Sequence, residues 1–550
     1  MILWIAVCLS AAACFWFFRQ ATHFLGDGYL VLRTLAVAAE TGDIPASFPT
    51  APLTGLLAVN VLRLLHHAGA GDPALLAWQL LSMGSGILAI PLFWYLAGHL
   101  WTDTRERMLG TALFLFSGSL MLFFAYVETY PLAFAVCIAY VGAALGVQRG
   151  RASLWLASTL FSLLVFLHVG MSIFAPSLLY LFVKHLRAQG WSPVLRASLS
   201  ILVVSAAALI VVGYAPNGLV ATFTRDGASF LPLHFTDAWG SAYALFSLWH
   251  FVDLMNVFLL ILPFSLVLVG GFAASAFLPA RFRHADATFW MFLAGPALLW
   301  LFFNNFELGL SRDWDLAAAF VFVIALAGVV SWSELMGPGQ ARMRGLVIMV
   351  ILTGVQTVGW VAVNTSAERS LRRFETLLDF RFQSERAVAI ALEEVGGYRR
   401  SQYDFEGAAD AYAQCVVLDS MNARRWTLLA NAATMSGNPI AQSSYERAIA
   451  LGSEDPEVYL NLGILRFLSG EVREGIRLAQ DAAERDSLNA TIAYTLGRMY
   501  EDGARDTLSA LPWFLRAVEL DSTLVDAHKR AKECFWGSAS SKEMPRGAGR

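Results

Sequence analysis

The sequence carries little charge for its length, and this scarcity bounds the class of protein. Only 15% of the 550 residues are charged, whereas 57% are hydrophobic and the mean hydropathy is +0.56. A soluble chain of this length would not have such a composition. The chain also lacks a basic stripe with interleaved aromatic residues, so nothing in it indicates nucleic acid as a partner.

The cysteines show neither a CxxC pair nor a spacing typical of metal ligands. Three lie in apolar runs and two in later helical stretches, so we expect them to pack as small apolar residues. They are Cys8, Cys14, Cys137, Cys415 and Cys534.

Long apolar runs fill the first two thirds of the chain. Several reach the roughly 20 residues that a helix needs to cross the hydrocarbon core of a membrane. The sequence therefore predicts an all-α fold, a polytopic transmembrane helical bundle of about eleven spans. The candidate runs are residues 1–18, 74–98, 108–125, 131–147, 153–170, 172–183, 197–214, 254–277, 288–303, 316–332 and 345–363.

The first run has an alternative interpretation as a signal peptide, because Ala11-Ala12-Ala13-Cys14 resembles a lipoprotein cleavage site. No Lys or Arg precedes the run, however, and the apolar stretch continues through Phe15–Phe18. We therefore expect an uncleaved first helix.

The connections between the runs alternate in charge. One set is short and rich in arginine: Arg105, Arg107, Arg149, Arg151, Lys184, Arg187, Arg196, Arg281, Arg283, Arg342 and Arg344. The other holds the carboxylates and histidines: Asp27, Glu40, Asp43, Glu128, His250, Asp253, Glu307, Asp313 and Asp315. Cytoplasmic loops retain Lys and Arg, so we expect the first set in the cytoplasm and the second outside. The N-terminus would be cytoplasmic and the C-terminal domain extracytoplasmic, in a multi-pass protein of a bacterial inner membrane.

After residue 363 the apolar stretches shorten and charges of both signs appear at helical spacing. From Leu392 onward a period of about 34 residues appears, and the spacing resembles the tetratricopeptide repeat (TPR), an α-solenoid. Its recurring small and aromatic pairs are Ala408 with Tyr412, Ala441 with Tyr445, and Ala510 with Phe514. The predicted domains are a transmembrane domain at 1–363, a connecting helix at 364–391, a TPR domain at 392–535 and a disordered tail at 536–550.

Asp27 is the first candidate for chemistry, because it stands between Gly26 and Gly28 just after the first run, beside Tyr29. The glycines let the backbone turn sharply and leave the carboxylate at the outer interface. Partial desolvation there would raise its pKa and suit it to take a proton from an acceptor hydroxyl. Asp27 could equally be an ordinary N-cap of the helical stretch that follows.

Glu128 lies in a very short outer turn, residues 126–131. A carboxylate buried at such a turn is costly, which favours a partner or a chemical task. The alternative is an interfacial turn whose tyrosines lie at the level of the lipid headgroups.

His250 and Asp253 lie three residues apart on one predicted helix face. They would suit a phosphate-orienting pair or a metal site, but a third metal ligand is missing nearby, which favours a simple His–Asp pair.

Arg312 is the prominent cation of the late outer loop, with Asp313 and Asp315 beside it. Its planar guanidinium could clamp a phosphate while Trp314 anchors at the headgroup level. A salt bridge within the loop, from Arg312 to either aspartate, is the alternative.

Together these features resemble the GT-C superfamily of membrane glycosyltransferases. The shared features are many spans, a long first outer loop with interfacial helical stretches at 27–39 and 53–67, and acidic residues at Asp27 and Glu128. With the added repeats, the chain looks most similar to transmembrane-and-TPR O-mannosyltransferases. The resemblance implies Asp27 as catalytic base and Glu128 as an assisting or metal-binding carboxylate.

The resemblance further implies transfer of a sugar from a polyprenyl-phosphate donor to a protein or glycan acceptor on the outer face. We expect Arg312, His250, Asp253, Asp313, Asp315 and Tyr29 to bind substrate, and the repeats to recruit the acceptor or a partner. A divalent cation is a possible cofactor. The rival hypothesis is a non-enzymatic, membrane-anchored TPR scaffold for an envelope assembly.

Overall fold

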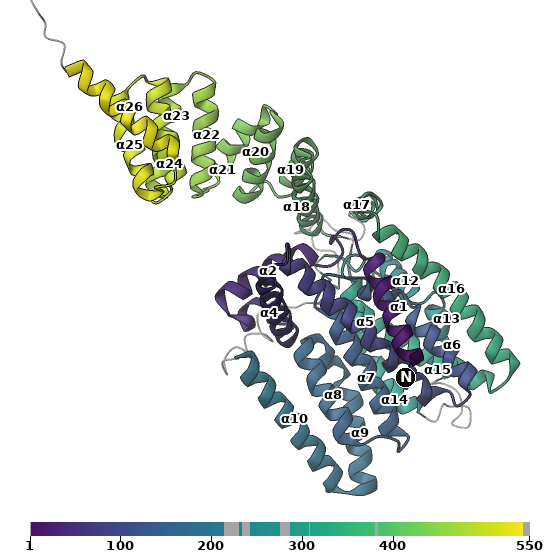
Figure 1. Ribbon diagram of the computed structural model, residues 1–550. Helices are drawn as coiled ribbons and strands as arrows, with labels where there is room; N and C mark the ends of the chain where they lie inside the picture. The colour runs from purple at the N-terminus through teal and green to yellow at the C-terminus, as the bar shows by residue number, and fades with distance from the viewer. Residues whose placement is uncertain are drawn as a thin grey trace, which may run out of the picture. The chain divides into compact units, whose positions relative to one another are not determined.

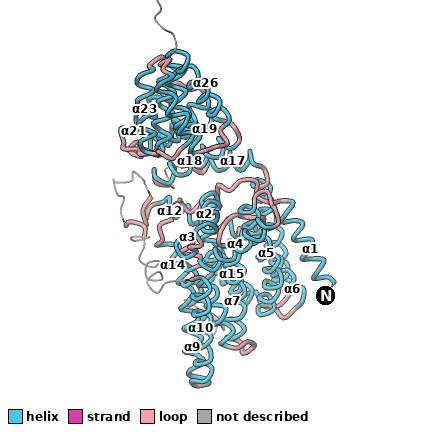
Figure 2. The backbone as a smooth tube through the Cα atoms, turned by 60° about the vertical axis from the view of Figure 1, so that its left-hand side comes forward, coloured by secondary structure: helices cyan, strands magenta, loops and turns pink. Residues whose placement is uncertain are grey.

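The computed structural model describes residues 2–213, 230–233, 243–275, 286–306, 308–379 and 383–542. Within these ranges the chain forms helices and loops, and the only β pairing is an isolated bridge between Phe230 and Asn304 (Figure 2). The all-α prediction is therefore confirmed. Arg281, Arg283, Glu307 and the tail beyond residue 542 lie outside the described residues. The chain divides into two compact units, Met1–Ala387 and Val388–Arg550.

The first unit contains the apolar helices and the candidate site (Figure 1). Its elements are α1 (Ile2–Phe17), α2 (Gly28–Thr41), α3 (Ile44–Ser47), α4 (Pro52–His67), α5 (Pro73–Leu100), α6 (Thr104–Leu115), η1 (Gly118–Phe123), α7 (Tyr130–Gln148), α8 (Leu154–Leu167), η2 (Val169–Phe174), α9 (Ala175–Gln189), α10 (Trp191–Val212), α12 (Leu248–Ile261), α13 (Ser265–Ser275), α14 (Ala287–Phe303), α15 (Trp314–Met336), α16 (Gln340–Asn364) and α17 (Ala367–Thr376).

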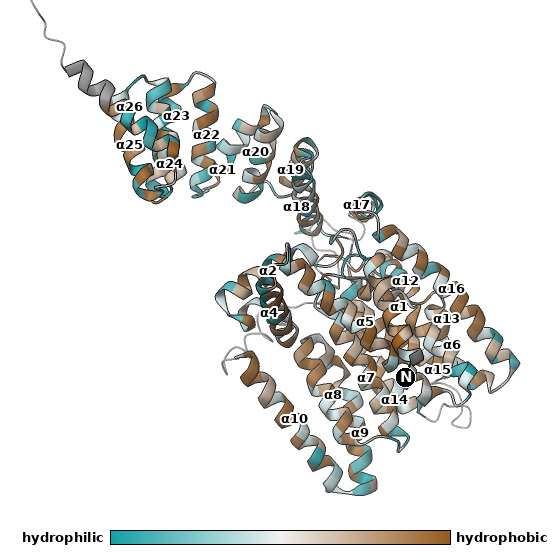
Figure 3. Ribbon diagram, viewed as in Figure 1, coloured by the Kyte–Doolittle hydropathy of each residue, from teal (hydrophilic) through white to brown (hydrophobic). Residues whose placement is uncertain are grey.

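Six helices of this unit are long and apolar enough to cross a membrane: α5, α7, η2 with α9, α10, α15 and α16. Three shorter apolar helices, α1, α8 and α14, accompany them. Helices α7 and α15 are apolar all round and buried on nearly every side, as expected for the centre of a bundle (Figure 3). The unit is thus a polytopic membrane bundle, and the count of eleven spans stays a prediction.

Two of the predicted runs do not form single helices. The run 108–125 ends its α-helix at Leu115 and continues as the 3₁₀ turn η1. The run 254–277 breaks into α12 and α13, whose axes differ by 108°. Pro263 lies in that break and cannot donate a backbone hydrogen bond, which accounts for the interruption. Hydropathy alone could not locate either break, because the residues on both sides are equally apolar.

The arginine-rich connections meet at one end of the bundle. Arg342 joins Glu106 through two hydrogen bonds of 2.8 and 2.5 Å. Arg149 reaches Asp286 at 2.7 Å. Both carboxylates are buried, so each of these acidic residues is neutralised by an arginine from a connection distant in sequence. We call this group the paired end of the bundle.

The second unit is a stack of antiparallel helix pairs. Its elements are α18 (Glu385–Ser401), which begins at the unit boundary, α19 (Phe405–Leu418), α20 (Ala423–Ser436), α21 (Ile440–Ala450), α22 (Pro456–Leu468), α23 (Val472–Arg485), α24 (Ala490–Arg498), the π-helical turn η5 (Met499–Gly503), α25 (Thr507–Leu520) and α26 (Val525–Lys542).

The small and aromatic residues that define the period are buried between these helices, including Ala441, Tyr445, Ala510 and Phe514. Helices α22 and α23 approach so closely that a Cβ atom at Gly463 would lie 2.8 Å from the carbonyl oxygen of Gly475. The repeat pattern therefore corresponds to close helix crossings, as its spacing predicts.

Candidate active site

The loop after α1 pairs with the loop before α15 through Gly26. The Gly26 amide donates to the Arg312 carbonyl at 2.9 Å, and the Arg312 guanidinium donates back to the Gly26 carbonyl at 3.4 Å. Gly26 has φ of 66°, a left-handed conformation that favours glycine. Asp27 and Arg312 are therefore neighbours although 285 residues separate them in sequence.

Two further carboxylates close around the same glycine. A Cβ atom at Gly26 would lie 2.5 Å from Asp315 Oδ2 and 2.8 Å from Glu128 Oε1, so no larger residue fits. The Asp27 amide donates to Glu128 Oε1 at 2.5 Å. We call Gly26 with Asp27, Glu128, Arg312 and Asp315 the Gly26 cradle.

The turn that carries Glu128 is fixed by backbone contacts. The Tyr126 amide donates to Ser82 Oγ at 2.9 Å, and the Gln20 amide donates to the Phe124 carbonyl at 3.0 Å. The Glu128 side chain is 4% exposed. Its burial, and then the nearby Asp315 and Asp27 carboxylates, raise the pKa of Glu128 well above its usual range. The turn thus holds a carboxyl that favours its protonated form.

Asp27 occupies the N-cap position of α2, but its side chain makes no capping hydrogen bond. The aspartates that cap neighbouring helices behave differently: Asp43 accepts from Ala46 and Asp72 accepts from Leu75, both at 3.0 Å. Capping therefore does not account for Asp27. Asp27 is exposed, whereas Glu128 and Asp315 beside it are buried.

Asp313 and Tyr29 border the cradle. Asp313 Oδ2 accepts weakly from the Leu308 amide at 3.4 Å. Burial, followed by the charges of Asp315 and Asp27, raises the pKa of Asp313, while Arg312 opposes this shift. Tyr29 lies on the first turn of α2, where its ring packs edge-on against His23 and Phe24.

The guanidinium of Arg312, which is fully buried, lies against an aromatic ring. The Arg312 Cζ atom lies 5.0 Å from the ring centre of Phe374, a residue of α17. Phe374 stacks on Phe24 with ring centres 4.8 Å apart. A second aromatic group consists of Tyr126, Trp314 and Trp360, with successive ring centres 5.5 and 5.2 Å apart, and we call it the aromatic wall.

His250 and Asp253 are linked through a third residue, and the Asp253 carboxylate also accepts from the backbone amide of Leu310, in the loop that carries Arg312. The Tyr243 hydroxyl donates to Asp253 Oδ2 at 3.2 Å and lies 3.0 Å from His250 Nδ1. His250 Nε2 lies 2.9 Å from the Phe302 carbonyl. The expected direct His–Asp pair is thus replaced by a bridge through Tyr243, because His250 is turned toward the end of α14.

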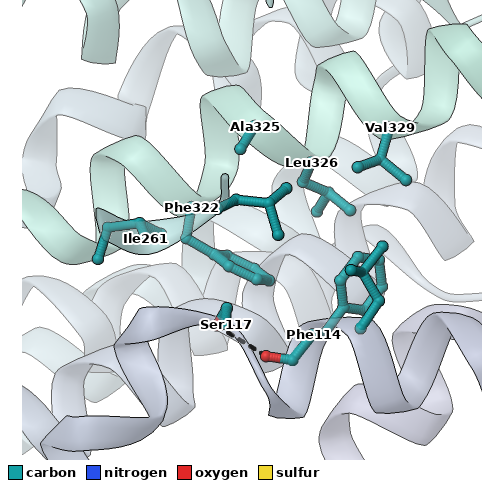
Figure 4. A pocket seen from close by; sticks show the side chains of 9 residues that line it. Phe114, Ser117, Ile261, Phe322, Ala325, Leu326 and Val329 are labelled. Atoms are coloured by element: carbon teal, nitrogen blue, oxygen red, sulfur yellow. Dashed lines mark hydrogen bonds between the residues drawn. The ribbon is translucent and has the colours of Figure 1, made fainter. Parts of the chain in front are cut away.

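In the described part of the chain, no three histidine, cysteine, aspartate or glutamate residues are placed to hold a metal ion. We therefore derive no metal step. An internal cavity lies elsewhere in the bundle, between α6, α12 and α15 (Figure 4). It is lined by apolar residues such as Phe114, Phe322 and Leu326, has room for about one water molecule, and contains no residue of the cradle.

The sequence pointed to the carboxylates, Arg312 and the turn at Gly26, but it did not predict that the others meet at Gly26, nor the contributions of Tyr243, Trp360 and α17. A glycine at positive φ leaves no periodic signal. The sequence shows the amphipathic pattern after residue 363, but it does not show which surface of the bundle the helix covers.

No protein-family model and no curated protein matches the chain. Among solved structures, it is similar to ArnT from Cupriavidus metallidurans bound to undecaprenyl phosphate, a GT-C glycosyltransferase. That match has 15% identity, covers 81% of this chain and 79% of that chain, and has a TM-score of 0.45.

The chain is also similar to the MamA protein, with 22% identity over 28% of this chain and 82% of that chain, and a TM-score of 0.26. A third match is YrrB, a TPR protein with an unusual peptide-binding site, at 20% identity over 28% of this chain and 78% of that chain, with a TM-score of 0.26. The solved structures to which the chain is similar thus include ArnT over most of its length and a TPR protein over about a quarter of it. At these identities and TM-scores, neither substrate nor mechanism transfers to this chain.

Proposed function

We propose that the chain is an integral-membrane glycosyltransferase that moves a sugar from a polyprenyl-phosphate donor to an acceptor at the face of the bundle that carries the Gly26 cradle. The observation that carries this proposal is the convergence of Asp27, Glu128 and Arg312 on one glycine. A scaffold needs no such convergence, whereas an enzyme needs its base and its phosphate-binding group within reach of one substrate.

The reaction follows from the chemistry of these groups. The bond between the sugar C1 atom and the donor phosphate oxygen breaks, and the leaving polyprenyl phosphate keeps the electron pair. A new bond forms between C1 and the acceptor oxygen, and the hydroxyl proton passes to the Asp27 carboxylate. Arg312 stabilises the charge on the phosphate as it leaves.

Glu128 acts as a positioning residue in this scheme. Its Oε1 accepts from the Asp27 amide, so it fixes the backbone that carries the base. Because its raised pKa favours the neutral carboxyl, Glu128 adds little negative charge beside the donor phosphate.

We assign acceptor or partner recruitment to the helix pairs of the second unit, since stacked repeats offer extended binding surfaces. The arginine segregation favours the cytoplasm for the paired end and the outer side for the Gly26 cradle.

The direct test is Asp27→Asn in the full chain, assayed for sugar transfer from a polyprenyl-phosphate donor. The variant keeps the shape and removes the base, so transfer should fall by about 10²-fold or more while the protein still folds. Asp43→Asn is the matched control: Asn caps a helix as well as Asp does, and we expect full activity. Unchanged transfer by Asp27→Asn would refute the assignment of the base.

A further inference from the structure

Helix α17 brings a concentration of positive charge to the end of the bundle that otherwise holds the carboxylates. It directly follows the last long span and carries Arg369, Arg372 and Arg373 within ten residues. Arginine is disfavoured on the outer side of a membrane protein, so its retention there indicates a use.

The helix is fastened to the bundle on the side of the Gly26 cradle. Ser370 Oγ lies 2.6 Å from Thr22 Oγ1, and Phe374 is buried in its stack on Phe24. These contacts fix which arginine turns inward. Arg372 faces solvent and pairs with Glu368 at 2.7 Å, with its side chain 73% exposed.

Arg373 turns toward the aromatic wall instead. Its Cζ atom lies 4.5 Å from the ring centre of Trp360, which in turn packs on Trp314. Arg373 is partly buried and makes no ion pair within the part of the chain that the structure describes. A guanidinium keeps its charge in proteins, so a cation that has no ion pair among the described residues faces this wall.

Two polar groups lie deeper in the wall, where the Tyr126 hydroxyl faces the Trp314 indole and the Asp315 carboxylate. The Tyr126 hydroxyl and the Trp314 indole N–H are buried, and among the described residues neither completes a hydrogen bond of normal geometry. Both can donate to an anion, as Arg373 can. Buried donors that remain unsatisfied are costly, and they commonly mark a place that a ligand or ion fills.

Arg312 and Arg373 have different electrostatic surroundings. Arg312 hydrogen-bonds the Gly26 carbonyl and lies near Asp313, which borders the cradle. Arg373 instead lies against the indole of Trp360. Asp315 lies near the Tyr126 hydroxyl, but Arg373 itself has no ion pair among the described residues and can therefore bind an added phosphate.

We propose that Arg373 of α17, together with the Tyr126 hydroxyl and the Trp314 indole N–H, binds the phosphate of the lipid-linked donor. This inference rests on the proposed function and names a substrate-binding residue in a segment outside the spans. The helix that links the membrane bundle to the repeat unit thereby forms part of the donor site.

The same phosphate chemistry could come from ordinary anionic phospholipids, and the surface charge of α17 distinguishes the two sources. Attraction to lipid headgroups would depend on the exposed Arg369 and Arg372 as much as on Arg373. Of the three arginines of α17, a dedicated donor site depends on Arg373 alone.

The experiment measures equilibrium binding of radiolabelled undecaprenyl phosphate to the full chain in phosphatidylcholine nanodiscs. Undecaprenol, which lacks the phosphate, and phosphatidylglycerol serve as competitors. Arg373→Gln should weaken binding by about ten-fold or more. Arg372→Gln, the matched control on the same helix, should stay within about two-fold of the wild type. Arg373→Lys keeps the charge but loses the planar fork, and we expect an intermediate affinity.

Wild-type affinity in Arg373→Gln, with transfer still dependent on Asp27, would overturn the Arg373 site and leave the proposed function standing. Equal losses in Arg372→Gln and Arg373→Gln, with phosphatidylglycerol competing as well as undecaprenyl phosphate, would show headgroup attraction instead. A wild-type chain that binds undecaprenol as tightly as undecaprenyl phosphate would refute both proposals. If Arg373→Gln fails to fold, Arg373→Lys decides, because unchanged affinity there would contradict a bidentate contact.

Discussion

The two ends of the membrane bundle bury the same kind of residue in opposite ways. At the paired end, Glu106 and Asp286 each meet an arginine from another connection. At the Gly26 cradle, Glu128 and Asp315 lie beside one another, and neither forms an ion pair within the described chain. One end pairs each buried carboxylate with an arginine, whereas the other buries two carboxyl groups side by side, which raises the pKa of Glu128.

The difference distinguishes charged groups that stabilise the fold from charged groups that serve binding or catalysis. A buried carboxylate with a bidentate arginine costs little in the folded state and stabilises one arrangement of the loops. Two buried carboxylates around one glycine gain nothing for stability, so their retention fits a task in binding or catalysis. Substitutions at the two ends should therefore differ in their effect on the free energy of unfolding.

The largest effect on stability is expected from Arg342→Ala. It leaves Glu106 buried without its partner and should destabilise the protein by about 3–5 kcal/mol. Thermal unfolding in detergent measures this as a lower apparent Tm. Arg344→Ala, an exposed arginine two residues away, is the control and should change little. The double variant Arg342→Ala, Glu106→Gln should recover much of the loss, and no recovery would contradict the pairing.

Arg149→Ala should have a smaller effect of the same sign. The side chain of Arg149 is 24% exposed against 13% for Arg342, so water can partly replace the lost contact with Asp286. We expect a loss of about 1–3 kcal/mol in the same unfolding measurement. Arg151→Ala, in the same connection and exposed, serves as the reference. A loss larger than that of Arg342→Ala would reverse the ranking by burial.

Glu128→Gln should have the smallest effect on the free energy of unfolding. Unlike the two arginine variants, it should stabilise the protein at neutral pH, by no more than about 1 kcal/mol. The pKa of Glu128 is raised in the folded state, so its carboxyl ionises at a lower pH in the unfolded chain than in the folded protein. Wild-type stability should therefore fall, relative to Glu128→Gln, as pH increases above about 4.3 toward the raised pKa.

Thermal unfolding of both proteins across this pH range gives the comparison. If the stability of the two proteins changed with pH in parallel, the pKa of Glu128 would be the same in the folded and unfolded states. We also expect transfer activity to fall in Glu128→Gln while stability does not, which is the pattern of a group retained for function rather than folding.

Several properties were fixed by local sequence. The apolar runs predicted the helical membrane bundle, and the segregation of arginine predicted which connections meet at the paired end. The period that includes Ala441 and Tyr445 predicted the helix pairs. These properties depend on residues within one or two helical turns of each other, or on the charge of a whole connection. Periodicity and composition report such short-range relations directly.

Tertiary structure alone decided which residues share a site. Gly26 meets Arg312 across 286 residues, and Asp27 meets Glu128 across 101. It also turned His250 toward Phe302, and it turned Arg373 inward while Arg372 faces solvent. Such juxtapositions arise from how helices and loops pack, and no spacing within a single segment encodes them. The sequence could name the charged residues at one end of the bundle, but only the fold could tell which of them lie together.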